Sequence, residues 1–264
     1  MRLGALELLA NLSSGRLSTT DKDPFPHQLA LQQYVKKPPR SNGLRRILIA
    51  DEVGLGKTIE VGLILRDILL ARGKLEGFRC LYLTSGGLVD DAAEKLRDVL
   101  SGIVDGNSLV DTVRSFRDYG SGNTLGVHVA STHAARLYAT DVRKKQLPPR
   151  IRPQIVIIDE CHHAASEGNL AGVEVRRQVA TQTYMAVKQL LSGEFWVDSE
   201  APQLAILMSA TPFRSRAQFV NLLRLLTHGV EQPGQAEFSA FDAHVQPRRG
   251  KSSVPAIRHS RQLT

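Results

Sequence analysis

Residues 51–58, Asp-Glu-Val-Gly-Leu-Gly-Lys-Thr, have the residue types and spacing of a phosphate-binding loop. They follow the apolar run 47–49 and lead directly into a helical pattern over 59–70. In a strand–loop–helix order, the N–H groups of the loop and the positive end of the helix dipole point at one place, which favours phosphate binding. Gly54 and Gly56 would let the backbone close around the phosphate oxygens, because they carry no Cβ. The alternative interpretation is a glycine-rich helix cap followed by an exposed lysine.

Three side chains in or before this loop predict nucleotide binding. Lys57 would contact the β- and γ-phosphates of a nucleoside triphosphate, and the Thr58 hydroxyl would ligate Mg²⁺. The strict P-loop pattern requires glycine at position 51, where this chain has Asp51. Gln28 precedes the loop at the start of a predicted helix and could bond the edge of an adenine base. A surface glutamine at a helix start is the alternative.

A pair of acids could complete an ATPase site. Asp159 and Glu160 directly follow the run Ile-Val-Ile-Ile at 155–158. Such a β-branched run is typical of a strand buried on both faces of a parallel sheet, and ligands bind at the carboxyl ends of such strands. Asp159 would hold Mg²⁺ through water, and Glu160 would orient and deprotonate the attacking water. The alternative is an acidic turn that only ends the strand.

Alternating strands and helices must position these residues, and this order predicts a doubly wound, mostly parallel α/β sheet with helices on both faces. We interpret 164–202 as containing a helix over 172–191 and Trp196 as a packing residue. Residues 101–124 are rich in Gly, Asp, Ser and Asn, and they predict loop with at most one helix. The expected strands are 47–49, 79–84, 126–132, 154–158 and 204–208; the other expected helices are 2–12, 26–35, 88–100, 133–145 and 216–226.

Composition limits the class of protein. At 264 residues, the chain has room for one large α/β domain or two small ones. No apolar run approaches membrane-spanning length, and the start does not resemble a secretory signal. Cys80 and Cys161 lie in or beside apolar strand patterns, which fits a reduced, cytoplasmic protein. Adjacent residues rarely converge on one ion, so Cys-His-His at 161–163 does not predict a zinc site.

Much of the positive charge lies in the C-terminal tail. The formal net charge is +8, and residues 246–264 carry five basic side chains with no acid, which leaves +3 for the remainder. The overall charge is therefore weak evidence for a polyanionic partner. The composition of the tail predicts disorder. A plain solvated end and a basic arm that grips phosphate are both open interpretations.

Three motifs in this order resemble those of superfamily 2 helicases. They are Asp-Glu-Val-Gly-Leu-Gly-Lys-Thr-Ile-Glu at 51–60, Asp-Glu-Cys-His at 159–162 and Ser-Ala-Thr-Pro at 209–212. The opening Asp-Glu resembles the Swi/Snf branch, and especially the bacterial RNA-polymerase-associated ATPase and the Swi/Snf-like proteins of phage defence. The resemblance implies a RecA-like P-loop NTPase fold, ATP and Mg²⁺ as cofactors, and a motor that tracks along duplex DNA.

The resemblance also implies roles for individual residues. Lys57, Asp159 and Glu160 would be catalytic, and Thr58 with Asp159 would hold the metal. In place of the family's usual Ala-Pro near 84–86, this chain has Ser-Gly-Gly at 85–87 and then Asp90 and Asp91, which would repel a phosphate backbone. The implied ATP-binding residues are Gln28, Asp51, Gly54, Leu55, Gly56, Lys57 and Thr58; the coupling residues are His162, Ser209, Ala210 and Thr211; the nucleic-acid contacts are Thr84, Ser85, Ser131 and Thr132.

The expected domain organisation is an N-terminal extension at 1–23, an ATP-binding lobe at 24–240 and a basic tail at 241–264. Motors of this kind need a second RecA-like lobe that supplies arginine fingers, and this sequence has no room for one. We therefore expect a truncated or split motor that binds ATP weakly and hydrolyses it slowly without a partner lobe. Two alternatives are a strand-separating DNA or RNA helicase lobe and a non-catalytic, nucleotide-dependent binding subunit. A P-loop kinase fits least, because it has no place for the motif at 209–212.

Overall fold

The computed structural model describes residues 26–36, 45–52, 54–72, 77–101, 109–117, 119, 125–165, 167–168, 179–212 and 216–227. The expected helix at 2–12, the N-terminal extension and the basic tail lie outside these residues.

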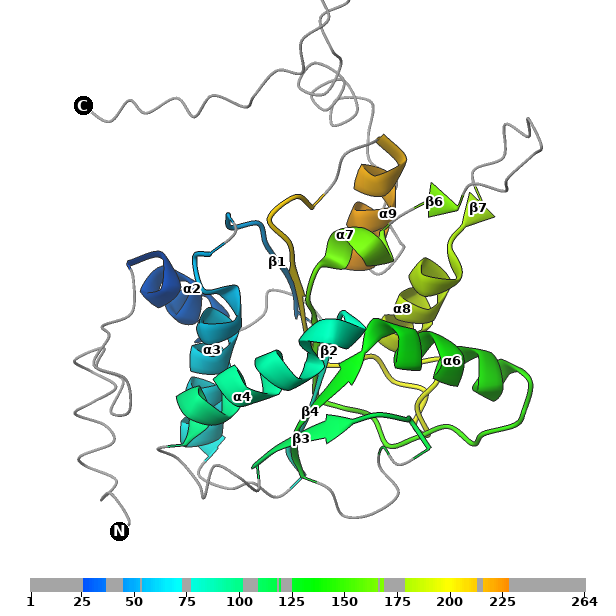
Figure 1. Cartoon of the computed structure of the whole chain (residues 1–264), viewed down its shortest axis with the longest axis horizontal. Helices are drawn as coiled ribbons and strands as arrows, with labels where there is room; N and C mark the ends of the chain where they lie inside the picture. Colours follow the sequence, from blue (N-terminus) through cyan, green and yellow to red (C-terminus); the bar gives the residue numbers. More distant parts are fainter. Residues whose placement is uncertain are drawn as a thin grey trace, which may run out of the picture.

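A six-stranded sheet forms the centre of the described part of the chain (Figure 1). The strand order is β1-β8-β5-β2-β4-β3, and every neighbouring pair is parallel. This confirms the doubly wound α/β prediction. The strands are β1 (Arg45–Ile49), β2 (Arg79–Thr84), β3 (Val110–Val113), β4 (Gly126–Ser131), β5 (Ile155–Ile158) and β8 (Leu204–Met208).

Strand β3 corrects the expectation of a loop at 101–124. Only Val110 and Val113 of its four residues are buried, and the strand pairs with β4 alone. Such a short edge strand inside a Gly- and Asp-rich segment shows no readable alternation, so tertiary pairing decides its conformation.

The helix expected over 172–191 is also corrected. Residues Val179–Ala180 form strand β7, which pairs antiparallel with β6 (Glu167–Gly168). Helix α8 (Gln182–Ser192) begins only after Thr181, whose hydroxyl accepts a hydrogen bond from the N–H of Tyr184 at 3.0 Å. The threonine is an N-cap, and a capping residue marks the start of a helix rather than its interior.

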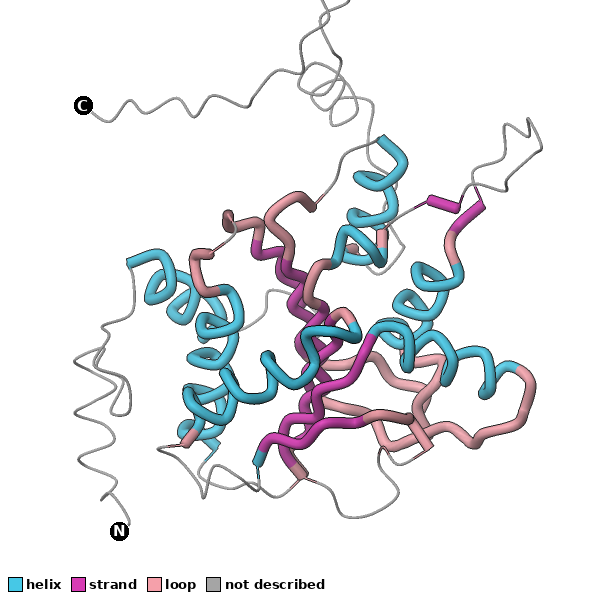
Figure 2. Tube along the Cα trace, in the orientation of Figure 1, coloured by secondary structure: helices cyan, strands magenta, loops and turns pink. Residues whose placement is uncertain are grey.

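Helices cover both faces of the sheet (Figures 1 and 2). Helices α3 (Lys57–Arg72) and α4 (Val89–Leu100) pack on one face, where the buried strand residues include Tyr82, Ile157 and Ile206. Helix α2 (Pro26–Lys36) packs against α3, and a 3-10 turn at Gly86–Leu88 precedes α4. The other face carries α6 (Thr132–Arg143), α7 (Cys161–Ala164), α8 and α9 (Arg216–Leu226).

Trp196 packs within the core on the α6–α8 face. Its side chain is only 1% exposed, its ring stacks near Tyr138, and its indole N–H donates to the Leu190 carbonyl at 2.9 Å. A fully buried indole with its donor satisfied is a packing residue, as the sequence predicted.

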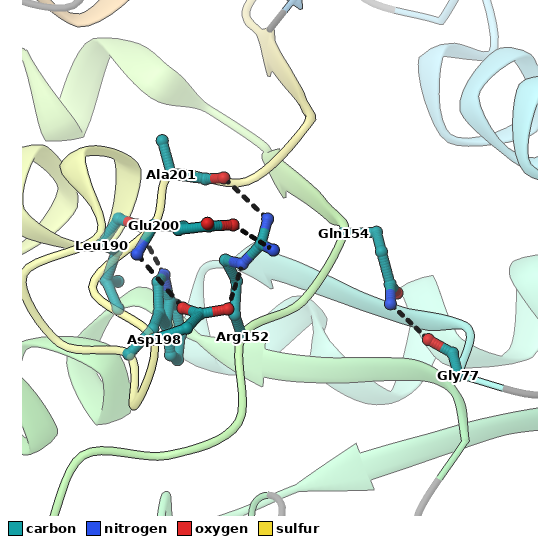
Figure 3. A network of polar contacts seen from close by, with 8 residues as sticks. Gly77, Arg152, Gln154, Leu190, Asp198, Glu200 and Ala201 are labelled. Carbon is teal, nitrogen blue, oxygen red and sulfur yellow. Dashed lines mark hydrogen bonds and ion pairs between the residues drawn. The ribbon is translucent and has the colours of Figure 1, made fainter. Parts of the chain in front are cut away.

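Polar side chains join the loops at the amino ends of the central strands (Figure 3). Arg152, before β5, forms ion pairs with Asp198 and Glu200 at 2.8 Å and donates to the Ala201 carbonyl, all before β8. Gln154 links β5 to the start of β2, since its amide contacts Gly77 (Figure 3). These contacts fix the ends of the strands opposite to the motif loops.

Arginines of β1 bind the ends of three helices. Arg45 donates to the carbonyls of Tyr34 and Val35 in the last turn of α2. Arg46 donates to Leu191 at the end of α8, at 2.6 Å, and to Leu225 at the end of α9. A guanidinium complements the negative end of a helix dipole and its unpaired carbonyls. Among the described residues, no helix is both long and apolar enough to cross a membrane.

Candidate active site

The predicted phosphate loop lies between β1 and α3. Gly54 and Gly56 have φ angles of +87° and +78°, a region that residues with a Cβ rarely adopt. At Gly56 a Cβ would also meet the Gln28 amide nitrogen at 3.5 Å. The glycines are therefore required by the backbone conformation of the loop. Helix α3 begins at Lys57, so the N–H groups of its first turn face the loop.

The side chain of Lys57 folds back over the loop. Its Nζ donates to the carbonyl oxygens of Asp51 and Glu52, both at 3.0 Å. An ammonium that donates to neutral backbone carbonyls can transfer to phosphate oxygens, which are stronger acceptors. Contact of Lys57 with the β- and γ-phosphates stays a prediction.

Asp51 forms a carboxyl pair with Glu60. Glu60 is 2% exposed and hydrogen-bonds to Asp51 through their side chains. Burial and the neighbouring charge of Asp51 raise the pKa of Glu60 to about 7, although Lys57 opposes this shift. Because one carboxyl must carry a proton to bond the other, the pair adds less negative charge to the loop than two free acids would.

The Asp-Glu pair lies at the carboxyl end of β5. Asp159 accepts hydrogen bonds from the Thr84 hydroxyl at 3.1 Å and from the N–H of Glu160 at 3.0 Å. Burial raises the pKa of Asp159 above its ordinary value, with these donors acting in the opposite direction. Glu160 has a left-handed backbone, with φ at +49°, which is uncommon for a residue with a side chain and is often found at functional sites.

Tyr82 connects the two motifs across the sheet. Its hydroxyl lies 3.4 Å from the Thr58 hydroxyl, and it is close enough to the Asp159 carboxylate that each group affects the pKa of the other. Thr58 and Asp159, the two expected metal-binding residues, therefore have the Tyr82 hydroxyl as a common neighbour. Sequence reasoning missed Tyr82. The available signal was a hydroxyl-bearing residue in an otherwise apolar strand, Cys-Leu-Tyr-Leu at 80–83.

Glu160 also contacts the motif at 209–212. His162 Nδ1 lies 3.0 Å from the Glu160 carboxylate and 2.9 Å from the Ser209 hydroxyl. The Ser209 hydroxyl lies 3.5 Å from Glu160 and accepts from the N–H of Thr211 at 3.1 Å. The structure thus brings three of the four predicted coupling residues together; Ala210 lies between them in the chain.

Gln28 lies against the phosphate loop. Its side chain is 3% exposed, and its amide donates to the Leu55 carbonyl at 3.4 Å. Gln28 is therefore not the surface glutamine of the alternative interpretation, and its contact with the adenine edge stays a prediction.

The predicted nucleic-acid contacts lie side by side but differ in exposure. Thr84 of β2 pairs in register with Ser131 of β4. Thr84 is fully buried and bonded to Asp159, so its side chain is not exposed to a nucleic acid. Ser131 caps α6 by accepting from Ala134, Thr132 donates to the Thr84 carbonyl, and Ser85 is half-buried at the start of the 3-10 turn.

Asp90 and Asp91, which we expected to repel phosphate, form ion pairs. Asp90 contacts Arg114 at 2.8 Å, and Asp91 contacts Lys95 at 2.7 Å. Both pairs are exposed, so their charges are also screened by solvent. The local repulsion is therefore smaller than the sequence suggested.

These residues fit a magnesium nucleotide. The loop offers N–H groups and an ammonium to phosphate, while a hydroxyl and a carboxylate meet around Tyr82. Oxygen ligands of this kind, with water and phosphate completing the shell, are the usual environment of Mg²⁺ in nucleotide sites. Thr58 and Asp159 are the residues that would hold it.

Comparison with known protein families identifies the chain. The family described as "Type III restriction enzyme, res subunit" matches residues 21–214. This chain belongs to that family. Within it, the motifs and fold are those of a RecA-like, helicase-related ATPase lobe of superfamily 2.

Two known sequences are similar to this member of the family. The "Uncharacterized ATP-dependent helicase YqhH" of Bacillus subtilis (strain 168) is 27% identical over 244 residues, which cover 91% of this chain and 35% of that protein. The "RNA polymerase-associated protein RapA" of Histophilus somni (strain 129Pt) is 54% identical over 47 residues, 18% of this chain and 4% of its own length. The chain thus spans about a third of the length of the first relative.

Solved structures share the fold. The Sulfolobus solfataricus "SWI2/SNF2 ATPase core in complex with dsDNA" has a TM-score of 0.53 at 13% identity, covering 85% of this chain and 40% of that one. The Pyrococcus furiosus Hef helicase domain has a TM-score of 0.50 at 16% identity, and the match covers 77% of this chain and 36% of the Hef chain.

Proposed function

We propose that this chain is the ATP-binding lobe of a Swi/Snf-like ATPase that translocates on duplex DNA. The observation that carries the proposal is the Tyr82 hydroxyl, which lies between Thr58 of the phosphate loop and Asp159 of the acidic pair. The phosphate loop and the acidic pair, about a hundred residues apart in the chain, therefore lie close together, as binding of one magnesium nucleotide by both requires.

Each side chain has a definite part in this proposal. Lys57 would leave the Asp51 and Glu52 carbonyls and bind the phosphates, while Gln28 would bond the adenine edge. ATP supplies the phosphoryl group, and Mg²⁺ neutralises its charge. Glu160 would accept a proton from the attacking water; because His162 contacts both Glu160 and Ser209, movement of Glu160 would be transmitted to the strand end of β8.

Duplex DNA is the proposed track. Ser85, Ser131 and Thr132 lie at the carboxyl ends of β2 and β4 and are half-buried, and at this edge of the sheet they would contact the phosphate backbone of the DNA. A second RecA-like lobe, in the same protein or in a partner, would supply arginine fingers. Such a finger raises turnover by about 10³–10⁵.

Nucleotide binding and ATPase measurements test the proposal. The chain should bind a fluorescent ATP analogue in the presence of Mg²⁺, and Lys57→Ala should weaken binding about 10- to 100-fold, since a charged contact is worth on the order of 1.5–3 kcal/mol. Lys188→Ala, at an exposed lysine of α8, is the matched control and should bind as the parent does. Hydrolysis by this chain alone should be slow with or without duplex DNA. An absence of Mg²⁺-dependent nucleotide binding would refute the proposal, and a DNA-stimulated turnover of about 1–100 s⁻¹ would refute the need for a second lobe.

A strand-separating helicase is the second candidate, favoured by the name of the similar Bacillus subtilis protein, an ATP-dependent helicase. A motor reconstituted with its second lobe distinguishes the two. Displacement of a triplex-forming strand without separation of the duplex supports translocation, whereas release of one duplex strand supports the helicase.

A further inference from the structure

Tyr82 is placed to control the geometry of the metal site. Its side chain is 0% exposed and lies on the face of β2 that packs against α3, beside Thr58 and Asp159. Burying a phenol hydroxyl without a partner is costly, and here both partners are expected metal-binding groups. A purely apolar residue would fill the same space without this cost.

The direction of the hydrogen bonds follows from the chemistry of the groups. An ionised carboxylate can only accept, and burial and the nearby Asp159 raise the pKa of Tyr82, so the Tyr82 hydroxyl keeps its proton and directs it toward Asp159. With its proton used in this way, the Tyr82 oxygen is left to accept from the Thr58 hydroxyl, 3.4 Å away. The result is a relay from Thr58 to Tyr82 to Asp159.

This relay has a consequence for a cation. When Thr58 donates its proton to Tyr82, the lone pairs of its oxygen point elsewhere and are available to a metal. Asp159 accepts hydrogen bonds from Thr84 and from the N–H of Glu160, so its carboxylate orientation is fixed from two sides, with the Tyr82 hydroxyl nearby. Outer groups that orient metal ligands commonly change metal affinity 10- to 100-fold when removed.

We propose that Tyr82 is a positioning residue of the metal site, which orients the Thr58 hydroxyl and the Asp159 carboxylate toward Mg²⁺. This inference rests on the proposed function, since it assumes that the site binds a magnesium nucleotide.

Tyr82→Phe tests the inference because it removes one oxygen and keeps the ring. Binding of a fluorescent ATP analogue is titrated with Mg²⁺ and repeated in EDTA. The expected result is an increase of about 10-fold in the Mg²⁺ concentration at half-saturation, with unchanged binding in EDTA. Combining Tyr82→Phe with Thr58→Ala should add little to the effect of Thr58→Ala alone, because the relay is already broken.

Tyr119→Phe is the matched control. Tyr119 is also fully buried, but it packs in the core on the opposite face of the sheet, near Trp196. Its hydroxyl has no hydrogen-bond partner among the residues that the structure describes. Tyr119→Phe should reach half-saturation at the same Mg²⁺ concentration (the Mg²⁺ midpoint) as the parent protein.

Each outcome decides between defined possibilities. An unchanged Mg²⁺ midpoint in Tyr82→Phe, or an equal loss of binding with and without Mg²⁺, overturns the inference while leaving the proposed function intact. Absence of Mg²⁺-dependent binding in the parent instead refutes the proposed function. Circular dichroism checks folding; Tyr82→Met, a flexible apolar filler, carries the same prediction if the first variant is insoluble. Failure of both to fold while Tyr119→Phe folds would assign Tyr82 a structural role and overturn the inference.

Discussion

The buried carboxyl of Glu60 sets the electrostatics of the phosphate loop. It bonds to Asp51, and Lys57 is the nearby cation that opposes the rise of its pKa. Asp51 stands where the general P-loop pattern has glycine, so this family member carries an acid close to the expected phosphate site. A proton shared between Asp51 and Glu60 offers a physical account of how that acid is accommodated.

Glu60 should make the stability of the protein fall as pH rises. The folded pKa of Glu60 is raised to about 7 from an ordinary value of about 4.5. Between these values the unfolded chain has lost the proton that the folded chain keeps, so the free energy of unfolding decreases from about pH 5 to pH 7 and then levels off. The effect should be on the order of 1–3 kcal/mol. Urea unfolding in EDTA at several pH values measures it.

The variant Glu60→Gln should flatten this pH dependence, because an amide does not ionise in the range. Glu94→Gln, at an exposed position of α4, should keep the parent's slope. A slope unchanged by Glu60→Gln would mean that another group titrates in this window.

At the scale of elements, β1 is held by the helices whose ends it binds. The guanidinium of Arg46 reaches both α8 and α9, while Arg45 binds α2, the helix that carries Gln28. Burial lowers the pKa of Arg46 to about 10, so the side chain remains charged at neutral pH. These contacts fix the position of β1, which leads into the phosphate loop, relative to helices that are far away in the chain.

Arg46→Met should destabilise the protein by about 2–4 kcal/mol, because two buried helix-end carbonyls lose a charged donor. Arg46→Lys should destabilise the protein less than Arg46→Met does, because the lysine keeps the charge but lacks the forked guanidinium that spans two carbonyls. Chemical unfolding measures the change. Arg114→Ala, which breaks an exposed ion pair, is the control and should change stability by less than about 1 kcal/mol. Equal effects of Arg46→Met and Arg114→Ala would contradict the role of Arg46.

At the scale of the whole molecule, stability should be highest in the middle of the sheet. Strands β8, β5, β2 and β4 each have a neighbour on both sides, and all five residues of β8 are buried. The described residues of the phosphate loop, 51–52 and 54–58, are exposed or half-buried, and β1 has a single described neighbour, β8.

Hydrogen exchange should therefore be slowest in β5 and β8 and fastest in the phosphate loop. Addition of Mg²⁺ and an ATP analogue should slow exchange in the loop and the first turn of α3, with little change in the middle of β8. Mass spectrometry on the intact chain measures these rates. Exchange in the loop as slow as in β8 before nucleotide is added would contradict this order.

The sequence was most informative where local chemistry is strict. The positive φ angles of the phosphate loop require glycine, as at Gly54 and Gly56, and the β-branched run before Asp159 is typical of a buried strand. It was least informative at β3 and at the start of α8, where a four-residue edge strand and a threonine cap depend on neighbours. Tyr82 and Thr84 show the same limit, because nothing in an apolar strand pattern says which polar atom a side chain will reach.

The amino-acid sequence by itself determined the strand–loop–helix character of the phosphate loop, the acidic pair at a strand end and the α/β class, because these follow from backbone sterics and from hydrophobic periodicity along short segments. Only the tertiary structure decided that β8 lies between β1 and β5, that Tyr82 joins Thr58 to Asp159, and that His162 lies between Glu160 and Ser209. Those relations depend on the order of strands in the sheet, which is set by packing between residues far apart in the chain.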